Sequence, residues 1–298
     1  MSYLTHIQRG VDQIEEHLDD ELSLAEVASH AGISQWHFQR IFRALTGETL
    51  KTYIRSRRMA RALDRLLSTD LRILDIAVAA RFESQEAFSR AFKKAFSMTP
   101  TQYRQLGREN LFPRKVQFDR QYLEHINQNI SQDPQMTKRP RMRLVGMKTR
   151  FYGVDSEKNN IASKIPPLWA EFTPRVLEIP HLVAGTGYGV IRTTSSDSDL
   201  LEYVAAVEVT DVGEAPPGMV ALELEAETYA VFDHRGDPDQ LDLTVNYIYS
   251  TWLTQSGKWH TQGADLEIYG PDYLQGSTES KMQYAIPIGD AVPEFARI

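Results

Sequence analysis

No proline occurs in the first 99 residues of the chain, whereas all 14 prolines lie at position 100 or later. A proline inside a helix costs about 3 kcal/mol relative to alanine, so a proline-free segment permits long, uninterrupted helices. The same segment has only three glycines, at positions 10, 32 and 47. We therefore predict that residues 1–106 are all-helical.

Charge divides the chain as well. Residues 1–139 hold 21 Lys and Arg against 17 Asp and Glu, whereas residues 140–298 hold 12 against 23. Within the first part, residues 36–65 carry eight basic and two acidic side chains. Such asymmetry suggests that one part of the chain meets a polyanion and the other does not. We expect a helical domain over 1–106, a polar linker over 107–139 and a second domain over 140–298.

The composition and the first residues favour a cytoplasmic protein. The chain has no cysteine, which removes disulfides and thiolate ligands, and no apolar run approaches the ~18 residues that a membrane span needs. The first 20 residues carry charged side chains, unlike a signal peptide. The eight histidines are scattered, and Gly185–Gly189 lacks the spacing of a nucleotide loop and is expected to form a bend or bulge. We expect no membrane partner, no metal, no cofactor and no enzyme activity.

The helical domain contains an internal repeat. The pattern Phe38-x-Arg40-x-Phe42 recurs fifty residues later as Phe88-x-Arg90-x-Phe92. Each copy is predicted to be a helix, a short turn and a second helix, over about 24–46 and 73–96. In the second helices, apolar residues at helical spacing predict a buried stripe, which in the two copies is made of Phe38, Ile41, Phe42 and Leu45, and of Phe88, Ala91, Phe92 and Ala95.

Local signals place the ends of these helices. Ser23 with Glu26 three residues later predicts a capping box, and Ser34 is expected to cap the next helix. Gly47 is expected to end that helix, as a C-terminal glycine does.

The outward faces of the second helices carry polar and basic side chains. Arginine can bind guanine with two hydrogen bonds in the DNA major groove and glutamine can bind adenine, while lysines neutralise phosphates. Trp36 can alternatively belong to the core, and Arg40 can be an ordinary surface charge. The candidate DNA-binding residues are Gln35, Trp36, Gln39, Arg40 and Arg43 in the first copy, Arg55 between the copies, and Gln85, Glu86, Ser89, Arg90, Lys93 and Lys94 in the second.

The segment Leu50–Leu67 between the copies is rich in arginine. As one helix it would span ~27 Å, near the ~34 Å between successive major grooves. One chain could then read two adjacent grooves without a partner copy. The arginines of this helix would touch the DNA backbone or pair with Glu48 and Asp64.

Residues 5–106 resemble the DNA-binding domain of the AraC/XylS family of transcription regulators, on the motifs Ser23–Phe42 and Ile73–Arg104. The resemblance implies a double helix-turn-helix that binds promoter DNA, with RNA polymerase as a partner and activation as the outcome. Glu86 departs from the pattern, because an acidic side chain repels phosphates. Most members place this domain at the C-terminus, whereas here it comes first.

Residues 140–298 are predicted to form an α+β domain. Alternating segments indicate strands, and two amphipathic helices are expected near Leu168–Phe172 and Leu243–Leu253. The order strand–helix–strand–strand occurs twice, beginning at Met142–Phe151 and at Tyr229–Arg235. We therefore predict a pseudo-two-fold domain with a cleft between its halves.

The second domain resembles the GyrI-like small-molecule-binding domain, on the segments Pro217-Gly218, Tyr229–Gly236, Tyr247–Leu253, Leu266–Tyr269 and Ile286–Ile288. The resemblance implies a cleft for amphipathic, often cationic, organic effectors, and aromatic rings suit a cation. Family members often have a glutamate where this chain has a glutamine, so a neutral or lipid-like effector is equally open. The candidate ligand-binding residues are Trp169, Tyr188, Tyr229, Trp252, Glu267, Tyr269 and Gln283.

Two other functions stay open at this point. The second domain could be a module that binds gyrase or a toxin, which the first domain merely brings to DNA. It could also be a hydrolase that uses Glu267 and Tyr269. Fusion to a DNA-reading domain favours a sensor, since a sensor must not destroy its signal quickly.

Overall fold

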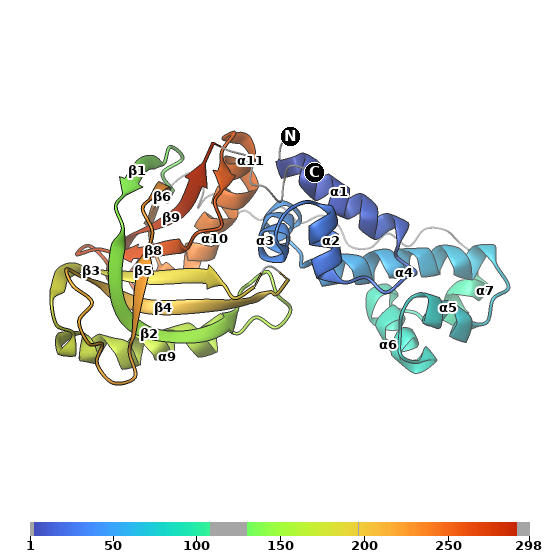
Figure 1. Cartoon of the computed structure of the whole chain (residues 1–298). Coiled ribbons are helices and arrows are strands. Elements are labelled where there is room, and N and C mark those ends of the chain that lie inside the picture. The colour runs from blue at the N-terminus through green and yellow to red at the C-terminus, as the bar shows by residue number, and fades with distance from the viewer. Residues whose placement is uncertain (1–2, 108–129, 196, 291–298) are drawn as a thin grey trace.

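The computed structural model describes residues 3–107, 130–195 and 197–290 of the chain. Helices make up its first part and a large sheet with helices on one face makes up its second part (Figure 1). The expected linker over 107–139 lies partly outside the described residues. Its last five residues form a strand, β1, rather than an irregular connection. In the first part the helices are α1 (Tyr3–Glu16), α2 (Leu24–His30), α3 (Gln35–Thr46), α4 (Leu50–Ser68), α5 (Ile73–Ala79), α6 (Gln85–Phe96) and α7 (Pro100–Leu106).

The repeat in the sequence is a repeat in the structure. Helices α2 and α3 form one helix-turn-helix unit, and α5 and α6 form the second. The side chains of Ser34 and Ser84 accept hydrogen bonds from backbone N–H groups in the first turns of α3 and α6. Gly47 ends α3 with a φ of 78°, in the left-handed region that favours glycine. The capping box expected at Ser23 does not form, because that side chain makes no capping hydrogen bond.

The two units have separate cores. Met59, Ala62 and Leu66 on the later part of α4 pack with Phe88 and Phe92 of the second unit. The first unit packs instead into an apolar cluster that continues into the second domain. The buried apolar stripes predicted for α3 and α6 extend too far toward the C-terminal ends of these helices, because Leu45 and Ala95 are exposed.

The second part of the chain is one antiparallel sheet, whose order is β1-β6-β9-β8-β3-β4-β2-β5, with a short strand β7 on β9. Its halves, β2–α9–β3–β4 and β6–α10–β8–β9, meet where β3 pairs with β8, which gives the predicted pseudo-two-fold arrangement. The strands are β1 (Gln135–Arg139), β2 (Met142–Tyr152), β3 (Leu182–Thr193), β4 (Leu200–Val209), β5 (Val220–Leu224), β6 (Glu227–Arg235), β7 (Trp259–His260), β8 (Asp265–Tyr269) and β9 (Lys281–Gly289).

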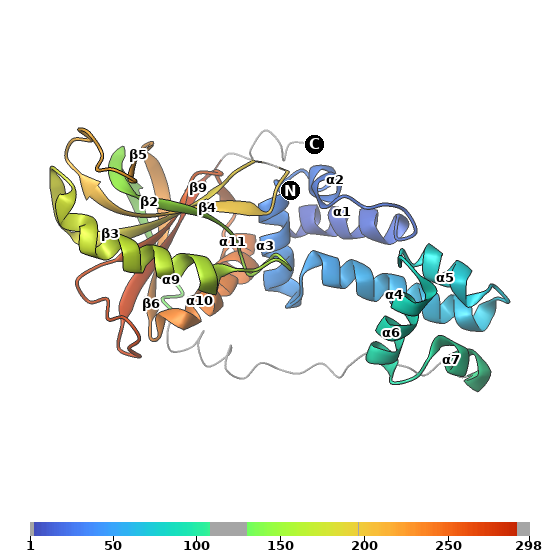
Figure 2. The same ribbon diagram turned by 90° about the horizontal axis from the view of Figure 1, so that it is seen from below.

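Two helical segments cover the same face of this sheet (Figure 2). One is α9 (Ile161–Phe172), which continues as a 3₁₀ turn over Thr173–Glu178. The other is α10 (Leu241–Tyr247), which passes through a π turn, η3 (Ile248–Trp252), into α11 (Leu253–Gln255). π turns are rare and often lie at functional sites. The register of β3 shifts between Leu182 and Gly187, so the glycine-rich segment forms the expected irregularity.

Candidate DNA-binding surface and effector site

The outward face of α6 is open to solvent, as predicted. Gln85, Glu86, Arg90, Lys93 and Lys94 are exposed. Ser89 on the same helix is half-buried. Hydrogen bonds from the helix backbone and from Ser84 hold the pKa of Glu86 below its usual range, so a negative charge lies among these basic side chains. The second helix-turn-helix unit is therefore free to meet another molecule.

The equivalent face of α3 is covered, contrary to the prediction. Trp36 and Gln39 are each 3% exposed, and Gln35 is also buried. The side chain of Arg40 is 12% exposed, and Arg43 is half-buried. The sequence pattern of α3 matches that of α6, so the difference comes from the second domain, which packs on α3 and, within the described residues, leaves the outward face of α6 exposed.

Acidic and aromatic groups of the second domain meet this face. Arg40 Nη1 lies 3.3 Å from Asp155 Oδ1, and the guanidinium of Arg40 lies over the ring of Tyr249 at 5.1 Å from its centroid. Burial raises the pKa of Asp242, while the positive charges of Arg40 and Arg43 lower it. These contacts place the basic residues of α3 against a negatively charged face.

A buried polar network lies beside Arg40. Nε2 of His260 lies 2.8 Å from Asp265 Oδ1, and the hydroxyls of Tyr249 and Tyr284 each donate to Asp265 Oδ2 at 2.7 Å. The ring of His37 on α3 packs against His260 in a tilted arrangement, with centroids 4.2 Å apart. Burial holds the pKa of His37 well below its usual value, and the charges of His260 and Arg40 add to this effect.

The start of the chain extends this contact. The backbone N–H of His260 donates to the Tyr3 hydroxyl at 2.9 Å, and the Tyr3 ring packs on Trp259. Farther along, Arg55 Nη2 lies 3.6 Å from Glu157 Oε2. The candidate Arg55 thus faces the second domain too.

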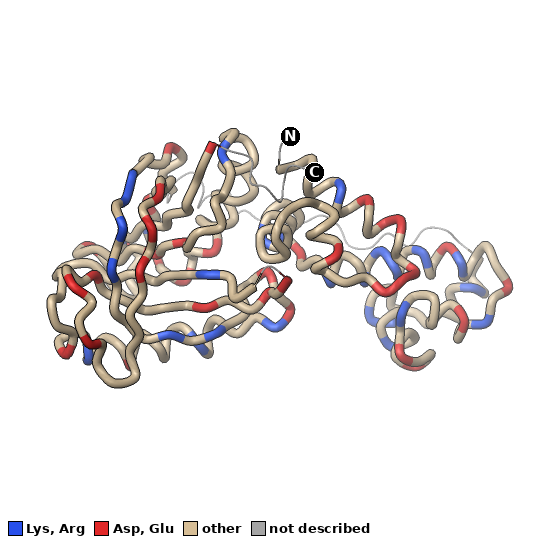
Figure 3. The backbone as a smooth tube through the Cα atoms, in the orientation of Figure 1, with Lys and Arg blue, Asp and Glu red and all other residues tan. Residues whose placement is uncertain are grey.

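The other arginines of α4 hold α1 and the turn that follows it rather than pairing with Glu48 or Asp64. Arg57 Nε donates to Glu15 at 2.7 Å, and Arg65 Nη2 lies 2.5 Å from Asp19. Basic positions gather on α4 and on the second unit, and acidic ones lie along the nearby end of α1 (Figure 3). These arginines therefore brace the domain and are less available to a DNA backbone than predicted.

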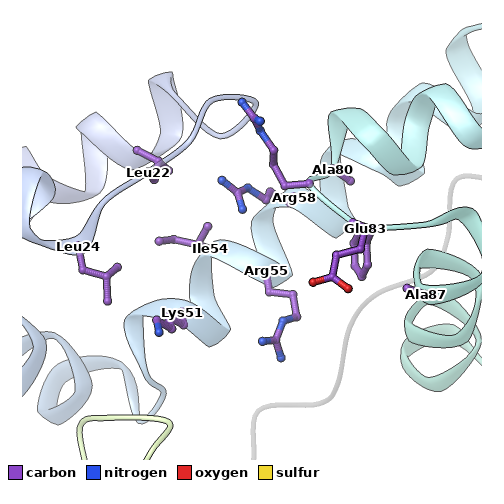
Figure 4. A pocket seen from close by; sticks show the side chains of 11 residues that line it. Leu22, Leu24, Lys51, Ile54, Arg55, Arg58, Ala80, Glu83 and Ala87 are labelled. Atoms are coloured by element: carbon purple, nitrogen blue, oxygen red, sulfur yellow. The ribbon is translucent and has the colours of Figure 1, made fainter.

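A cleft of about 430 Å³ separates the two units (Figure 4). Its floor is apolar and includes Ile54 and Phe82, and its wall carries Lys51, Arg55 and Glu83. Arg81 and Arg58 also line it, but they donate to backbone carbonyls.

On the covered face of the sheet, three aromatic side chains surround one carboxylate. Tyr203 and Tyr269 donate their hydroxyls to Glu267 Oε2 at 2.5 and 2.6 Å. Trp169 Nε1 donates to the Tyr203 hydroxyl at 2.9 Å, and the Trp169 ring meets that of Tyr269 edge to face. Burial raises the pKa of Glu267, and the two tyrosine hydrogen bonds lower it in part. We call Trp169, Tyr203, Glu267 and Tyr269 the carboxylate cage.

Glycines on β3 make room for the cage. A Cβ at Gly189 would overlap the Tyr203 hydroxyl and the Glu267 carboxylate. A Cβ at Gly187 would lie 3.4 Å from the Trp169 ring. The glycine-rich segment that lacks nucleotide-loop spacing therefore lets aromatic side chains approach the strand backbone.

The structure separates the seven predicted ligand residues. Trp169, Glu267 and Tyr269 meet in the cage, and Trp252 packs on Phe232 on the same face of the sheet. Three others lie on the opposite face, which corrects their assignment. Tyr188 and Tyr229 belong to the cluster there, and Gln283 donates to Asp233 at 2.9 Å.

Tyr203 is the cage residue that the sequence reasoning missed. Strand alternation carries the signal, because Leu201, Tyr203 and Ala205 share a face in β4. The pairing of Tyr203 with Ile191, and of Ile191 with Asp265, places Tyr203 across β3 from β8. That pairing depends on strand order, which the sequence alone does not supply.

No helix in the described part of the chain is both long and apolar enough to cross a membrane. Two family models match the chain. One describes a helix-turn-helix domain and matches residues 27–106, and the other describes a GyrI-like small molecule binding domain and matches residues 132–288.

The chain is similar to proteins named as regulators. The transcriptional regulator Rob of Salmonella typhimurium is 29% identical over 263 residues, which cover 87% of this chain and 88% of the relative. The regulatory protein SoxS of the same organism is 42% identical over 104 residues, which cover 35% of this chain and 97% of the relative. A solved structure of a protein bound to tetraphenylphosphonium shares 15% identity with a TM-score of 0.43, over 52% of this chain and 93% of the other.

Proposed function

The chain belongs to the GyrI-like small molecule binding family and is a transcription regulator with an AraC-type helix-turn-helix domain, and we propose that it activates promoters in response to an aromatic organic cation. The carboxylate cage carries this proposal. A cation is stabilised by ring faces and by a carboxylate that is shielded from water. Glu267 supplies that charge, while Gln283 lies on the other face of the sheet and is not part of the carboxylate cage.

A titration with tetraphenylphosphonium tests the effector class. This aromatic cation cannot lose its charge, so its binding reports on the carboxylate and the rings. We expect binding in a calorimeter, and we expect Glu267→Gln to weaken it by about tenfold or more. Tenfold corresponds to about 1.4 kcal/mol, and two opposite unit charges about 4 Å apart attract by up to about 4 kcal/mol where water is partly excluded.

The matched control is Glu225→Gln, which removes the same charge from an exposed position away from the cage. It should bind like the wild type. Equal binding by all three proteins, or none by the wild type, would contradict a cationic effector at Glu267.

The two helix-turn-helix units are proposed to bind adjacent major grooves through α3 and α6, with Arg40 and Arg90 as equivalent base contacts. Selection from random duplexes at a fixed salt concentration tests this. The proposal predicts two conserved half-sites about one helical turn apart. A single half-site that only Arg90→Ala alters would mean that α3 reads no bases.

RNA polymerase is the proposed partner in activation, in the cytoplasm. Leu74 and Val78 on α5, with Leu71 before it, are exposed apolar side chains on the second unit, and we assign the contact with RNA polymerase to them. In transcription from a selected promoter, Val78→Asp should lower activation and leave DNA affinity unchanged. Unchanged activation would remove this surface from the proposal.

We infer that the chain is a sensor and not a hydrolase. Glu267 accepts hydrogen bonds from both cage tyrosines, which suits a stationary counter-charge. Turnover of an ester library that Glu267→Gln abolishes would contradict this inference.

A further inference from the structure

The buried contact between α3 and the second domain concerns the residues that should read DNA. Gln35, Gln39 and Arg40 cannot lie in a major groove while they are covered. DNA and the second domain therefore compete for one helix face, and tight binding of either excludes the other.

The second domain meets this face with the chemistry of a DNA backbone. Asp155 faces Arg40, and Asp242 lies within the electrostatic reach of Arg40 and Arg43. Glu157 accepts a hydrogen bond from Thr52 at 3.2 Å and pairs with Arg55. Carboxylates of the second domain thus face basic side chains of α3 and α4 that are predicted to meet DNA.

The contact satisfies the polar atoms of α3 poorly. Within the described residues, six buried side-chain nitrogens have no hydrogen-bond partner, and four of them belong to α3. Buried donors without partners are rare in proteins and costly. A partner that offers hydrogen-bond acceptors to these atoms can therefore displace the second domain from α3. The four are Trp36 Nε1, His37 Nε2, Arg40 Nε and Arg43 Nη1.

The contact also adjoins the carboxylate cage. Asp265 and Glu267 lie two residues apart on β8, on the same face of the sheet. Asp265 accepts hydrogen bonds from Tyr249, which lies under Arg40, and from Tyr284, while Glu267 belongs to the carboxylate cage. The charge of Arg40 lowers the pKa of Glu267, so the two groups interact electrostatically. Figure 2 shows α3 beside α10 at the end of the covered face of the sheet.

We propose that Arg40 acts as an internal cation that holds the first reader helix on the second domain, and that a cationic effector in the carboxylate cage expels it and so frees α3 for DNA. The effector step rests on the proposed function. A second positive charge beside a desolvated guanidinium raises the free energy of the closed state. The open state, in which Arg40 is in water, bears less of this cost. The effector therefore binds the open state better, as linkage requires.

The test measures DNA affinity of the full-length chain by fluorescence anisotropy, on the tightest duplex from the random selection at fixed salt. Asp155→Asn removes the partner of Arg40. Glu223→Gln is the control, because it removes one negative charge from β5, where that residue pairs with Arg141 and Arg143. We expect Asp155→Asn to bind DNA about tenfold more tightly than Glu223→Gln and to respond little to tetraphenylphosphonium. Equal affinity of the two variants would overturn the proposal.

Hydrogen exchange on the wild type gives a second measurement that needs no variant. Tetraphenylphosphonium should speed exchange of the amides in 35–46 and leave those in 85–96 unchanged. If the cation binds without this change, the proposed coupling between the carboxylate cage and the contact of Arg40 is wrong. If the cation does not bind at all, the effector class fails, while the comparison of Asp155→Asn with Glu223→Gln still decides whether Arg40 is held.

Discussion

Gly189 lies directly against the hydroxyl of Tyr203, so closely that a methyl group at position 189 would overlap it and the Glu267 carboxylate. The two residues lie on neighbouring strands, β3 and β4, and their contact sets the position of the tyrosine in the cage. Glycine at 189 is thus a requirement of the cage rather than of backbone conformation.

Gly189→Ala should therefore destabilise the second domain and weaken effector binding. Extra atoms in a packed core cost about 1–3 kcal/mol. The control is Gly270→Ala, since a Cβ there would meet nothing within 4 Å. Chemical denaturation and calorimetry with tetraphenylphosphonium check both effects. Wild-type stability and binding in Gly189→Ala would show that the Tyr203 position is adjustable.

Binding of a permanent cation should depend on pH through Glu267. The pKa of this carboxyl is raised, mainly by burial, so its charge is lost at a higher pH than that of an exposed glutamate. Affinity for tetraphenylphosphonium should hold at neutral pH and decline as pH falls toward the raised pKa. Glu267→Gln should flatten the profile. A wild-type profile that is flat down to pH 4.5 would contradict the assignment.

Acid should also weaken the packing of α3 through His37. The folded-state pKa of this imidazole is well below its usual value of 6.5, so protons bind the unfolded or released state more readily. The contribution is present above pH 6.5 and is lost as pH falls from 6.5 toward the folded-state pKa. His37→Gln should lose less unfolding free energy than the wild type between pH 7.5 and 5.5. An equal loss of unfolding free energy in the two proteins would show that a group other than His37 causes the pH dependence.

Arg90 and Lys94 should separate base reading from phosphate attraction. Arg90→Ala should remove about 1–3 kcal/mol of discrimination at one base pair. Lys94→Ala should weaken all duplexes alike and lower the salt slope by about one. Affinities for the selected site and one-base variants at several salt concentrations test the pair. Identical behaviour of the two variants would show that α6 meets only the backbone.

The sequence predicts the helices of the first domain and the strands of the second closely, because proline absence, helical spacing and strand alternation are local signals. The repeat correctly implied two similar units. It also implied that the outward faces of α3 and α6 are equally exposed, and this prediction was wrong. Trp36 packs against Tyr249 and His260, more than 200 positions away, and no local pattern records such packing.

The candidate effector site was predicted in part for a related reason. Glu267 and Tyr269 share one short strand, so alternation joins them. Tyr188 and Tyr229 are equally aromatic and equally strand-like, but their positions within β3 and β6 turn them to the other face. Correct assignment needs the register, and the irregularity between Leu182 and Gly187 shifts the register of β3.

The separate core of the second helix-turn-helix unit has a thermodynamic consequence. Its apolar cluster is shared with the later part of α4, whereas the first unit shares its cluster with the sheet domain. The chain should therefore unfold in two thermal transitions whose boundary lies within the helical domain, and not between the two domains of the sequence. Calorimetry should separate the unfolding of α5–α7 from that of a larger cooperative block.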